Sequence, residues 1–567
     1  MNPAQLLEQF DRLADAPDAI PRLRRFILDL AVRGKLVLQD PNDESAAELV
    51  KRIQAEKARL INGGIARKEK PFPKLPEDYT PFCLPTNWRW SQLAQIGFIN
   101  PRNSAADTLA ASFIPMTLIS AEYGIASKHE VRPWGEIKSG FTHFADGDVA
   151  LAKITPCFQN GKSMVLRGLT GNIGAGTTEL HVVRPVLVDP DYVLIFLKSP
   201  HFIASGVPLM TGTAGQKRVA TEYFANSPFP LPPVAEQHRI VAKVDELMAL
   251  CDRLEAAQTE RESRRDRLVR ASLDLLNQPA DGDAFRDHAR FHLQQLSRLT
   301  TRPEDIRQLR QTILNLAICG KLVRQDPDDE PAQRLIERIQ SEQTQQQAEG
   351  IYKNSKPLPP IGEADRPFPL PFAWKWFRLR SLVFTLGDGL HGTPDYSEGT
   401  DCYFINGNNL VEGRIVIKPD TKTVSLAEMQ RHRKLMTLNT VLVSINGTLG
   451  NVAYYNNENV VLGKSACYFN LPSLIDKHFV RRVIESPYFA NYAIEQATGT
   501  TIRNLGLKAM NYFPVPLPPL AEQHRIVAKV NELMALCDRL EGQLTTAQTE
   551  SRRLLEAVLH EALAPTA

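Results

Sequence analysis

The chain has few cysteines and no long apolar run. Its seven cysteines are scattered along 567 residues and include no CxxC pair, a pattern that suggests neither a disulfide framework nor a zinc site. No stretch of about eighteen apolar residues occurs, and the segment MNPAQLLEQFDRLADAPDAI has acids where a signal peptide needs a basic flank. We therefore expect a cytoplasmic protein with reduced thiols and no membrane span.

Motifs of catalysis and nucleotide binding are missing as well. The sequence has no Walker-type GxxxxGKS or GxxxxGKT loop, no HExxH pair and no GxSxG elbow. The glycine run GNIGAGT at residues 171–177 lacks the strand-to-helix context of a nucleotide site. The sequence therefore predicts no catalytic residue, no metal site and no cofactor site in this chain. The net charge of +3 is almost neutral for this length, so charge alone neither supports nor opposes a polyanionic partner.

What the sequence does contain is a duplication. The segment IPRLRRFILDLAVRGKLVLQDPNDE, which begins at Ile20, returns at Ile306 as IRQLRQTILNLAICGKLVRQDPDDE, a shift of 286 positions. The pair Trp88 and Trp90 and the segment PLPPVAEQHRIVAKVDELMALCDRLE return with the same shift. Three segments with one offset indicate an internal repeat of the whole chain.

Between these repeated segments the two halves differ. Residues 91–227 and 377–513 are much less alike than the segments around them, although SPHF is echoed by SPYF and MTGTAGQKR by ATGTTIRNL. A structural duplication would be expected to let all parts drift similarly. Repeated segments that stay alike while the residues between them diverge favour two modules that bind different targets.

The first repeated segment predicts an amphipathic helix in each copy, because its apolar residues share one helical face. These residues are Ile20, Leu23, Ile27, Leu30 and Ala31 in the first copy and Ile306, Leu309, Ile313, Leu316 and Ala317 in the second. Gly34 and Gly320 stand where such a helix ends in a left-handed residue. Thr301 and Glu304 have the spacing of a capping box at the start of the second copy.

The second repeated segment predicts a long helix that follows a Pro-Pro pair. From Glu236 to Asn277 it would be on the order of 60 Å long, and a four-three alternation of apolar residues indicates a coiled-coil seam. The seam comprises Ile240, Val244, Leu247, Cys251 and Leu254 in the central copy and Ile526, Val530, Leu533, Cys537 and Leu540 in the C-terminal copy. The same alternation assigns Leu268 and Leu275 in the central copy, and Leu544, Ala547, Leu554 and Val558 in the C-terminal copy, to the seam. The alternative is an ordinary core helix.

Several basic residues in glycine-rich or polar settings are candidates for DNA contacts. Residues 137–187 and 401–475 alternate between short apolar runs and turn residues, which favours strands and loops. Small residues beside a basic side chain allow the backbone to approach a phosphate while the side chain enters a groove. The candidates are Lys217, Arg218, Arg431, Arg433, Lys434 and Arg503. Each group also fits a solvated surface face. We interpret His238 and His524, which repeat within AEQHRIV, as helix-surface residues of the frame.

With these residues described, the chain resembles the specificity subunits of type I restriction-modification enzymes over nearly its whole length. The resemblance rests on both copies of LRRFILDLAVRGKLVLQDPNDE and of PLPPVAEQHRIVAKVDELMALCDRLE. It implies two target recognition domains that each read half of a bipartite double-stranded DNA site. It also implies helices that dock two methyltransferase subunits, through which restriction subunits join. S-adenosylmethionine, ATP and magnesium would belong to those partners, and this subunit would be non-catalytic.

We therefore expect an α+β protein with two globular target recognition domains, separated by long antiparallel coiled-coil helices and related by an approximate two-fold duplication. The expected parts are an N-terminal helical region at 1–69, a recognition domain at 70–235, a long helix at 236–277, a linker with the second helical region at 278–355, a recognition domain at 356–521, and a long helix at 522–567. A protein-binding scaffold is the alternative. A fused enzyme is nearly excluded by the missing motifs.

Overall fold

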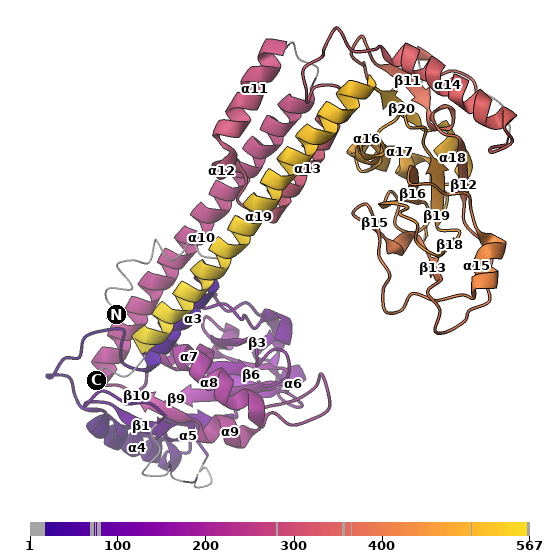
Figure 1. Ribbon diagram of the computed structural model, residues 1–567. Coiled ribbons are helices and arrows are strands. Elements are labelled where there is room, and N and C mark those ends of the chain that lie inside the picture. The colour runs from indigo at the N-terminus through magenta and orange to yellow at the C-terminus, as the bar shows by residue number, and fades with distance from the viewer. Residues whose placement is uncertain are drawn as a thin grey trace. The chain divides into compact units, whose positions relative to one another are not determined.

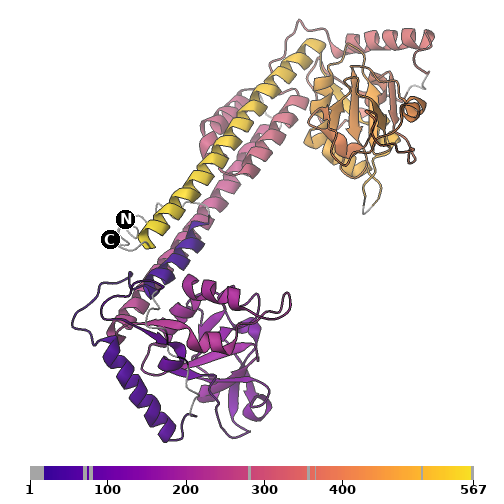
Figure 2. The same ribbon diagram turned by 60° about the horizontal axis from the view of Figure 1, so that its bottom comes forward.

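The computed structural model describes residues 18–67, 73, 75, 81–278, 282–353, 358–363, 366–499 and 502–563. The chain forms two compact units, Met1–Ser263 with Ala547–Ala567, and Arg264–Thr546. Both units mix helices and sheets, as the sequence predicts (Figure 1 and Figure 2). Each is described below by itself.

The first unit begins with two helices that carry the module. They are α3 (Ala19–Val32) and α4 (Ala46–Asn62). Strand β1 (Arg89–Gln92) then pairs antiparallel with β10 (Pro228–Leu231), which directly precedes the long helix α10 (Val234–Asn277). The two-stranded sheet of β1 and β10 thus connects the variable part of this unit to the repeated helices, which we call the frame.

Two four-stranded sheets build the first module. The antiparallel sheet has the order β2-β9-β6-β7 and the mixed sheet the order β4-β3-β8-β5. The strands are β2 (Gly97–Ile99), β3 (Ala110–Ile114), β4 (Glu130–Pro133), β5 (Thr142–Ala145), β6 (Val149–Ala152), β7 (Ser163–Val165), β8 (Ile173–Gly176) and β9 (Leu180–Pro185). Its helices are α5 (Leu93–Ile96), α6 (Trp134–Ile137), α7 (Pro190–Lys198), α8 (Pro200–Gly206) and α9 (Thr221–Asn226), with 3-10 turns η1 (Met116–Leu118), η2 (Thr170–Asn172) and η3 (Val207–Leu209).

The second unit repeats this plan with a different module. Its frame helices are α11 (Gly282–Gln294), α12 (Leu296–Leu299), α13 (Pro303–Ile318) and α14 (Ala332–Ala348), and β11 (Lys375–Arg378) pairs with β20 (Pro514–Leu517) before α19 (Leu520–Leu563). The main sheet has the order β12-β19-β16-β17, formed by β12 (Thr385–Asp388), β19 (Ala466–Asn470), β16 (Thr440–Ser444) and β17 (Val452–Tyr454). This order and its antiparallel pairing match those of β2-β9-β6-β7 in the first module.

Smaller elements complete the second module. They are β13 (Tyr403–Ile405) parallel to β18 (Val460–Leu462), the hairpin of β14 (Leu410–Val411) and β15 (Arg414–Ile415), helices α15 (Leu426–His432), α16 (Lys477–Ile484), α17 (Pro487–Gln496) and α18 (Leu507–Tyr512), and the 3-10 turns η5 (Leu379–Leu382) and η6 (Gly407–Asn409). The strands and loops expected at 401–475 are therefore present, with one helix among them.

The predicted long helices exist, and each has 44 residues. The first part of each predicted seam is buried or half-buried. In α10 this part comprises Ile240, Val244, Leu247, Cys251 and Leu254, and in α19 Ile526, Val530, Leu533, Cys537 and Leu540. Each set belongs to one apolar cluster with the short repeated helix of its own copy, α3 or α13. Ion pairs of 2.6–2.7 Å from Arg24 to Asp252 and from Arg310 to Asp538 hold the same helices together.

The heptad assignment fails for several leucines further along both helices, although Val558, which it also assigns to the seam, is buried. Leu268, Leu275 and Leu554 are 46%, 40% and 62% exposed, whereas the next residues along the chain, Val269, Leu276 and Leu555, are buried. A helix with 3.6 residues per turn drifts by about 20° per heptad from a 3.5-residue repeat. Five heptads lie between Ile240 and Leu275, so the drift of about 100° equals one residue. The buried face therefore follows a straight helix rather than the heptad pattern.

The ends of the repeated short helices agree only partly with the sequence predictions. Gly34 and Gly320 have φ values of +66° and +69°, which confirms the predicted left-handed positions. The predicted capping box is wrong, because the Asp305 carboxylate accepts hydrogen bonds from the backbone N–H groups of Thr301 and Arg302. Glu304 instead pairs with an arginine in the next turn of the helix. An acid one position later in the first turn is closer to these free N–H groups.

No single helix among the described residues is long and apolar enough to cross a membrane. The bent pair Pro190–Lys198 and Pro200–Leu209, whose halves meet at 57°, passes the same test of length and composition. Residues Tyr192 to Lys198 of this pair are buried inside the first module.

Candidate nucleic-acid interface

Lys217 lies on a hairpin whose backbone is fixed while its side chain is exposed. Thr211 and Arg218 exchange backbone hydrogen bonds of 3.0 and 2.8 Å, which close the loop between them. The carbonyl oxygen of Lys217 accepts from the N–H of Thr155, in the segment that follows β6, at 2.8 Å. Val219, the next residue but one, is 1% exposed and anchors the hairpin in the core.

Arg503 occupies the same position in the second module. Thr498 and Asn504 exchange backbone hydrogen bonds of 2.9 and 2.8 Å, and the carbonyl oxygen of Arg503 accepts from Gly447 N–H at 2.9 Å. Gly447 lies in the segment that follows β16, and Leu505, which is fully buried, anchors this hairpin. Thr500, which belongs to the predicted Thr-Gly-Thr motif, lies outside the described residues. Among the described residues, the backbone contacts that close each hairpin and attach it to the segment after β6 or β16 are thus equivalent.

Arg218 differs from Lys217, because its guanidinium is already engaged. Its Nη2 and Nε atoms both lie 2.9 Å from oxygens of Glu179, and Nη1 donates to the carbonyl oxygen of Gln216. The hydrogen bonds from Arg218 hold the pKa of Glu179 below its usual value. The equivalent residue of the second hairpin is Asn504, which has no such charge. Arg218 therefore braces its hairpin against the end of β9.

The third group of candidates surrounds the C-terminal end of α15. The Arg431 side chain is 72% exposed, with Nη1 3.8 Å from the Glu428 carboxylate. Arg433 follows the helix and is exposed, whereas Lys434 is half-buried. Helix α15 packs on β18, while the Arg503 hairpin is attached to the segment after β16. The α15 group is therefore supported by β18, and the Arg503 hairpin by the segment after β16.

Sequence reasoning missed a buried lysine that braces the loops beside the first hairpin. Lys198 ends α7 and is 5% exposed, and its ammonium group donates to the carbonyl oxygens of Ser120, Ala121 and Gly161 at 3.0–3.2 Å. Burial lowers the pKa of Lys198 to about 7. The turn that contains Gly161 presents the exposed amide side chains of Gln159 and Asn160. A lysine at the end of the otherwise apolar run YVLIFLK is the only signal that the sequence offers for this contact.

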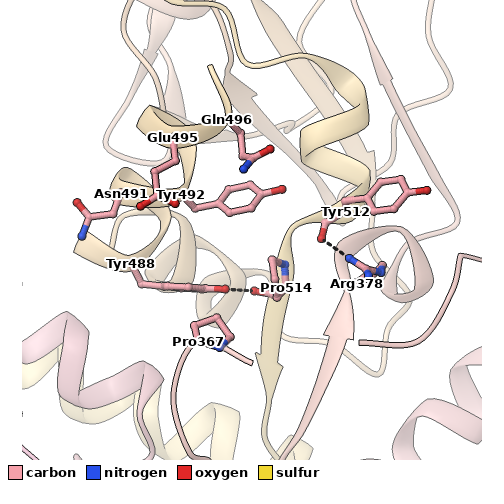
Figure 3. Close-up of a pocket in the computed structure, with 9 residues that line it drawn as sticks. All are labelled: Pro367, Arg378, Tyr488, Asn491, Tyr492, Glu495, Gln496, Tyr512 and Pro514. Carbon is pink, nitrogen blue, oxygen red and sulfur yellow. Dashed lines mark hydrogen bonds between the residues drawn. The ribbon is translucent and has the colours of Figure 1, made fainter. Parts of the chain in front are cut away.

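The second module also has a hollow lined by aromatic side chains. This cavity of about 550 Å³ lies between α17, α18 and β11. Figure 3 shows Tyr488 and Tyr492 on α17, with the Tyr488 hydroxyl donating to Pro514 O at 2.8 Å. Arg378 donates to the carbonyl oxygen of Tyr512 and stacks on its ring, 4.9 Å from the centroid. Helix α17 leads directly into the Arg503 hairpin, so the hollow adjoins that hairpin.

Candidate metal ligands are not brought together among the described residues, where no group of three or more His, Cys, Asp or Glu side chains is placed to hold an ion. His238 and His524 lie on the surface of the long helices, as expected, with side chains 65% and 62% exposed. Each stands 3.7–3.9 Å from the aspartate that caps the N-terminus of α7 or α16.

Comparison with known proteins gives consistent results. Residues 384–547 match the family model described as the type I restriction modification DNA specificity domain. The chain is 37% identical to the type I restriction enzyme EcoEI specificity subunit of Escherichia coli, over 96% of this chain and 94% of that protein. It is equally similar to the EcoAI specificity subunit of the same organism, with the same coverage of both chains.

Solved structures are more distant in sequence. The HsdS subunit from Thermoanaerobacter tengcongensis is 19% identical, with 85% of this chain and 98% of that chain covered and a TM-score of 0.45. The assignment rests on the sequence relatives, whose similarity includes both repeated segments and both variable modules. At 37% identity over 96% of its length, this chain belongs to the type I restriction enzyme specificity subunits.

Proposed function

We propose that this chain is the non-catalytic subunit that determines which DNA sequence a type I restriction-modification complex recognises. Its two modules, at 70–235 and 356–521, each read one half of a bipartite double-stranded site. One observation carries the proposal: Lys217 and Arg503 stand at equivalent positions on equivalent hairpins, while the residues around them differ. A shared basic contact beside different neighbours suits two modules that bind the same kind of polymer but read different sequences.

The candidate contacts divide by their surroundings. Lys217 and Arg503 extend from rigid hairpins, so they are the best candidates for base-edge contacts. Arg431 and Arg433 lie at a helix end on the surface, where phosphate contacts are more plausible. Arg218 supports the first hairpin through Glu179, and Lys434 is half-buried beside the α15 group.

We further propose that the long helices form an antiparallel frame with approximate two-fold symmetry. Two equivalent contacts support this proposal. The Lys35 ammonium donates to Leu563 O at the end of α19, within the first unit, and Lys321 donates to Gln278 O at the end of α10, within the second unit. Each repeated short helix thus leads to a lysine that caps the end of the long helix of the other copy. Cations at a helix C-terminus are stabilised by its free carbonyl groups.

The same frame would dock two methyltransferase subunits, and restriction subunits would join through them. Methyl transfer from S-adenosylmethionine and magnesium-dependent, ATP-driven cleavage would take place in those partners. This division of roles fits a chain whose sequence contains no Walker-type loop, HExxH pair or GxSxG elbow. Helical regions at 1–69 and 278–355 would supply docking surface beside the long helices.

The decisive experiment is to express the chain with its cognate methyltransferase subunit and to map methylated bases across the host genome. We expect a split motif with a fixed number of unread base pairs. Replacing residues 91–227 with the module of a relative should change one half of that motif only. Methylation without a split motif, or a change in both halves after the exchange, would contradict independent reading. A protein-binding scaffold would leave methylation without any dependence on this module.

A further inference from the structure

The first two turns of each long helix contain four residues, EQHR, that tie it to its module. We call residues 236–239 and 522–525 the joints. In the first joint, the two carboxylate oxygens of Glu236 accept hydrogen bonds from Trp88 Nε1 at 2.9 Å and Gln39 Nε2 at 2.7 Å. The Gln237 side chain accepts from Asp189 N–H at 2.8 Å and donates to a proline carbonyl at 2.9 Å.

The last residue of the first joint adds an ion pair. Arg239 Nη2 lies 2.6 Å from the Asp43 carboxylate. The partners of the joint come from three separate segments, namely the turn between α3 and α4, the residue before strand β1, and the N-terminus of α7. The long helix is therefore held from three directions at its first turn.

The second joint makes the same contacts to a different module. Glu522 accepts from Trp374 Nε1 at 2.9 Å and from Gln325 Nε2 at 2.5 Å. Gln523 accepts from Asp476 N–H at 2.9 Å. The ion pair of Arg525 with Asp329 is also 2.6 Å long. The contacts are thus retained although the modules they hold have diverged.

These contacts fix an angle as well as a position. Glu236 and Glu522 are each 1% exposed, and Gln237 and Gln523 are fully buried. Hydrogen bonds are directional, and a buried carboxylate that loses a donor finds no water to replace it. The apolar cluster around the joint is not directional, so by itself it would allow the helix to tilt. Burial raises the pKa of both glutamates, and the indole and amide donors partly offset this effect.

The length of the helix makes small tilts important. With 44 residues, α10 spans about 66 Å at 1.5 Å per residue. A tilt of about 5° at its start would move its far end by about 6 Å. That distance is close to the rise of two base pairs, at about 3.4 Å each. A frame that measures DNA to one base pair needs stiff joints.

We propose that Glu236 and Glu522 are positioning residues for spacer length: by fixing the angle between each module and its long helix, the joints restrict the assembled enzyme to one separation of the two half-sites. The inference rests on the proposed DNA-reading function. Neither glutamate touches DNA in this proposal, and the identity of each half-site is left to the modules.

The test uses the complex with the methyltransferase subunit and a set of duplexes. Each duplex carries both half-sites, separated by the natural number of base pairs or by one fewer or one more. Glu236→Gln keeps the shape of the side chain but replaces one acceptor oxygen with a donor nitrogen, so Trp88 and Gln39 can no longer donate to two separate oxygens, and the Gln39 amide must turn to stay bonded. Glu246→Gln and Glu532→Gln are matched controls, because both side chains are 65% exposed on the same two helices.

For Glu236→Gln we expect methylation of the altered spacers, relative to the natural one, to rise about tenfold over the wild-type ratio. The half-site sequences should not change, and the controls should keep the wild-type ratio. Arg239→Ala, whose side chain is 38% exposed, is a milder second variant and should shift the ratio in the same direction. It decides the question if Glu236→Gln does not assemble.

The proposal is overturned if activity falls equally for every spacer while the ratio stays constant, since that is the result of a merely structural role. A different outcome separates this proposal from the function on which it rests. If the wild-type complex methylates no split motif, the DNA-reading function itself is wrong.

Discussion

Replacing Gly34 with alanine should destabilise the turn after α3 far more than replacing Gly64 with alanine destabilises the turn after α4. Both glycines have left-handed backbones, with φ values of +66° and +71°. A Cβ at position 34 would stand 2.4 Å from Pro85 Cγ and 2.9 Å from Pro85 Cδ, whereas a Cβ at position 64 meets nothing within 4 Å. The pair therefore separates backbone strain from steric conflict.

The two costs can be estimated separately. A left-handed alanine costs about 1–2 kcal/mol, and this term applies to both variants. Forcing a methyl group against the rigid ring of Pro85, which has no flexible end to move away, adds about 1–3 kcal/mol of overpacking. We expect about 2–5 kcal/mol for Gly34→Ala and about 1–2 kcal/mol for Gly64→Ala.

Because a chain of two units need not unfold in one step, local stability is the better measurement. Hydrogen exchange of the amides in α3 and α4 and in the turns that follow them, measured by mass spectrometry, reports the opening free energy of each region. The repeat supplies an independent copy of the experiment, since a Cβ at position 320 would stand 2.4 Å from Pro371 Cγ, whereas a Cβ at position 350 would meet nothing within 4 Å. Equal losses at positions 34 and 64 would refute the steric argument.

Three further predictions concern the first module and the hairpins. Burial lowers the pKa of His181 to about 4, so the unfolded chain binds more protons between about pH 6.5 and 4. The free energy of unfolding should therefore decrease by up to about 3 kcal/mol as the pH falls through that range. His181→Gln should flatten this pH dependence in urea titrations. Asp148→Ala should lower thermal stability by about 3–5 kcal/mol, because it leaves Arg184 without the buried carboxylate 2.8 Å away. Lys217→Ala and Arg503→Ala should each cost about 1–3 kcal/mol of DNA affinity and relax one base position, whereas uniform weakening with a smaller salt slope would identify phosphate contacts. Fluorescence anisotropy at several salt concentrations distinguishes these results. Unchanged affinity would show that both residues are solvated surface residues without a DNA contact.

The frame could be predicted from the sequence because its signals are local or repeated. Helices α3, α13, α10 and α19 follow from apolar spacing, proline starts and a constant shift of 286 positions. The joints were visible as the repeated letters EQHR, but their role was not. Their partners, such as Trp88 and Asp189, lie 148 and 48 residues away from them in the chain, and no periodicity encodes such distances.

The candidate contacts show the same limit. The echo of Thr-Gly-Thr in both halves led to Lys217 and Arg503, whose equivalence rests on backbone pairing within short hairpins. Arg218 and Lys217 were equally good candidates in the sequence, because both are basic and follow the same glycine-rich loop. In the structure, however, the guanidinium of Arg218 is bound by Glu179, 39 residues away in the chain. Lys198 was missed because its environment consists of backbone carbonyls from two separate loops. Side-chain type predicts what a residue can do, whereas tertiary contacts decide whether it is free to do it.

The last prediction tests whether the central helix sets the spacer. Residues 258–265 of α10 carry polar side chains where the apolar face is interrupted, so insertions there disturb little packing. Four added residues would lengthen the helix by about 6 Å and rotate its distal part by about 40° beyond a full turn, whereas two would rotate it by about 200°. Because the buried face of α10 follows 3.6 residues per turn rather than a heptad, no supercoil is available to take up the larger rotation. We expect the four-residue variant to methylate sites with one or two extra spacer positions, at about 3.4 Å each, and the two-residue variant to be inactive. Full activity on the original spacer after the four-residue insertion would show that α10 does not set the distance.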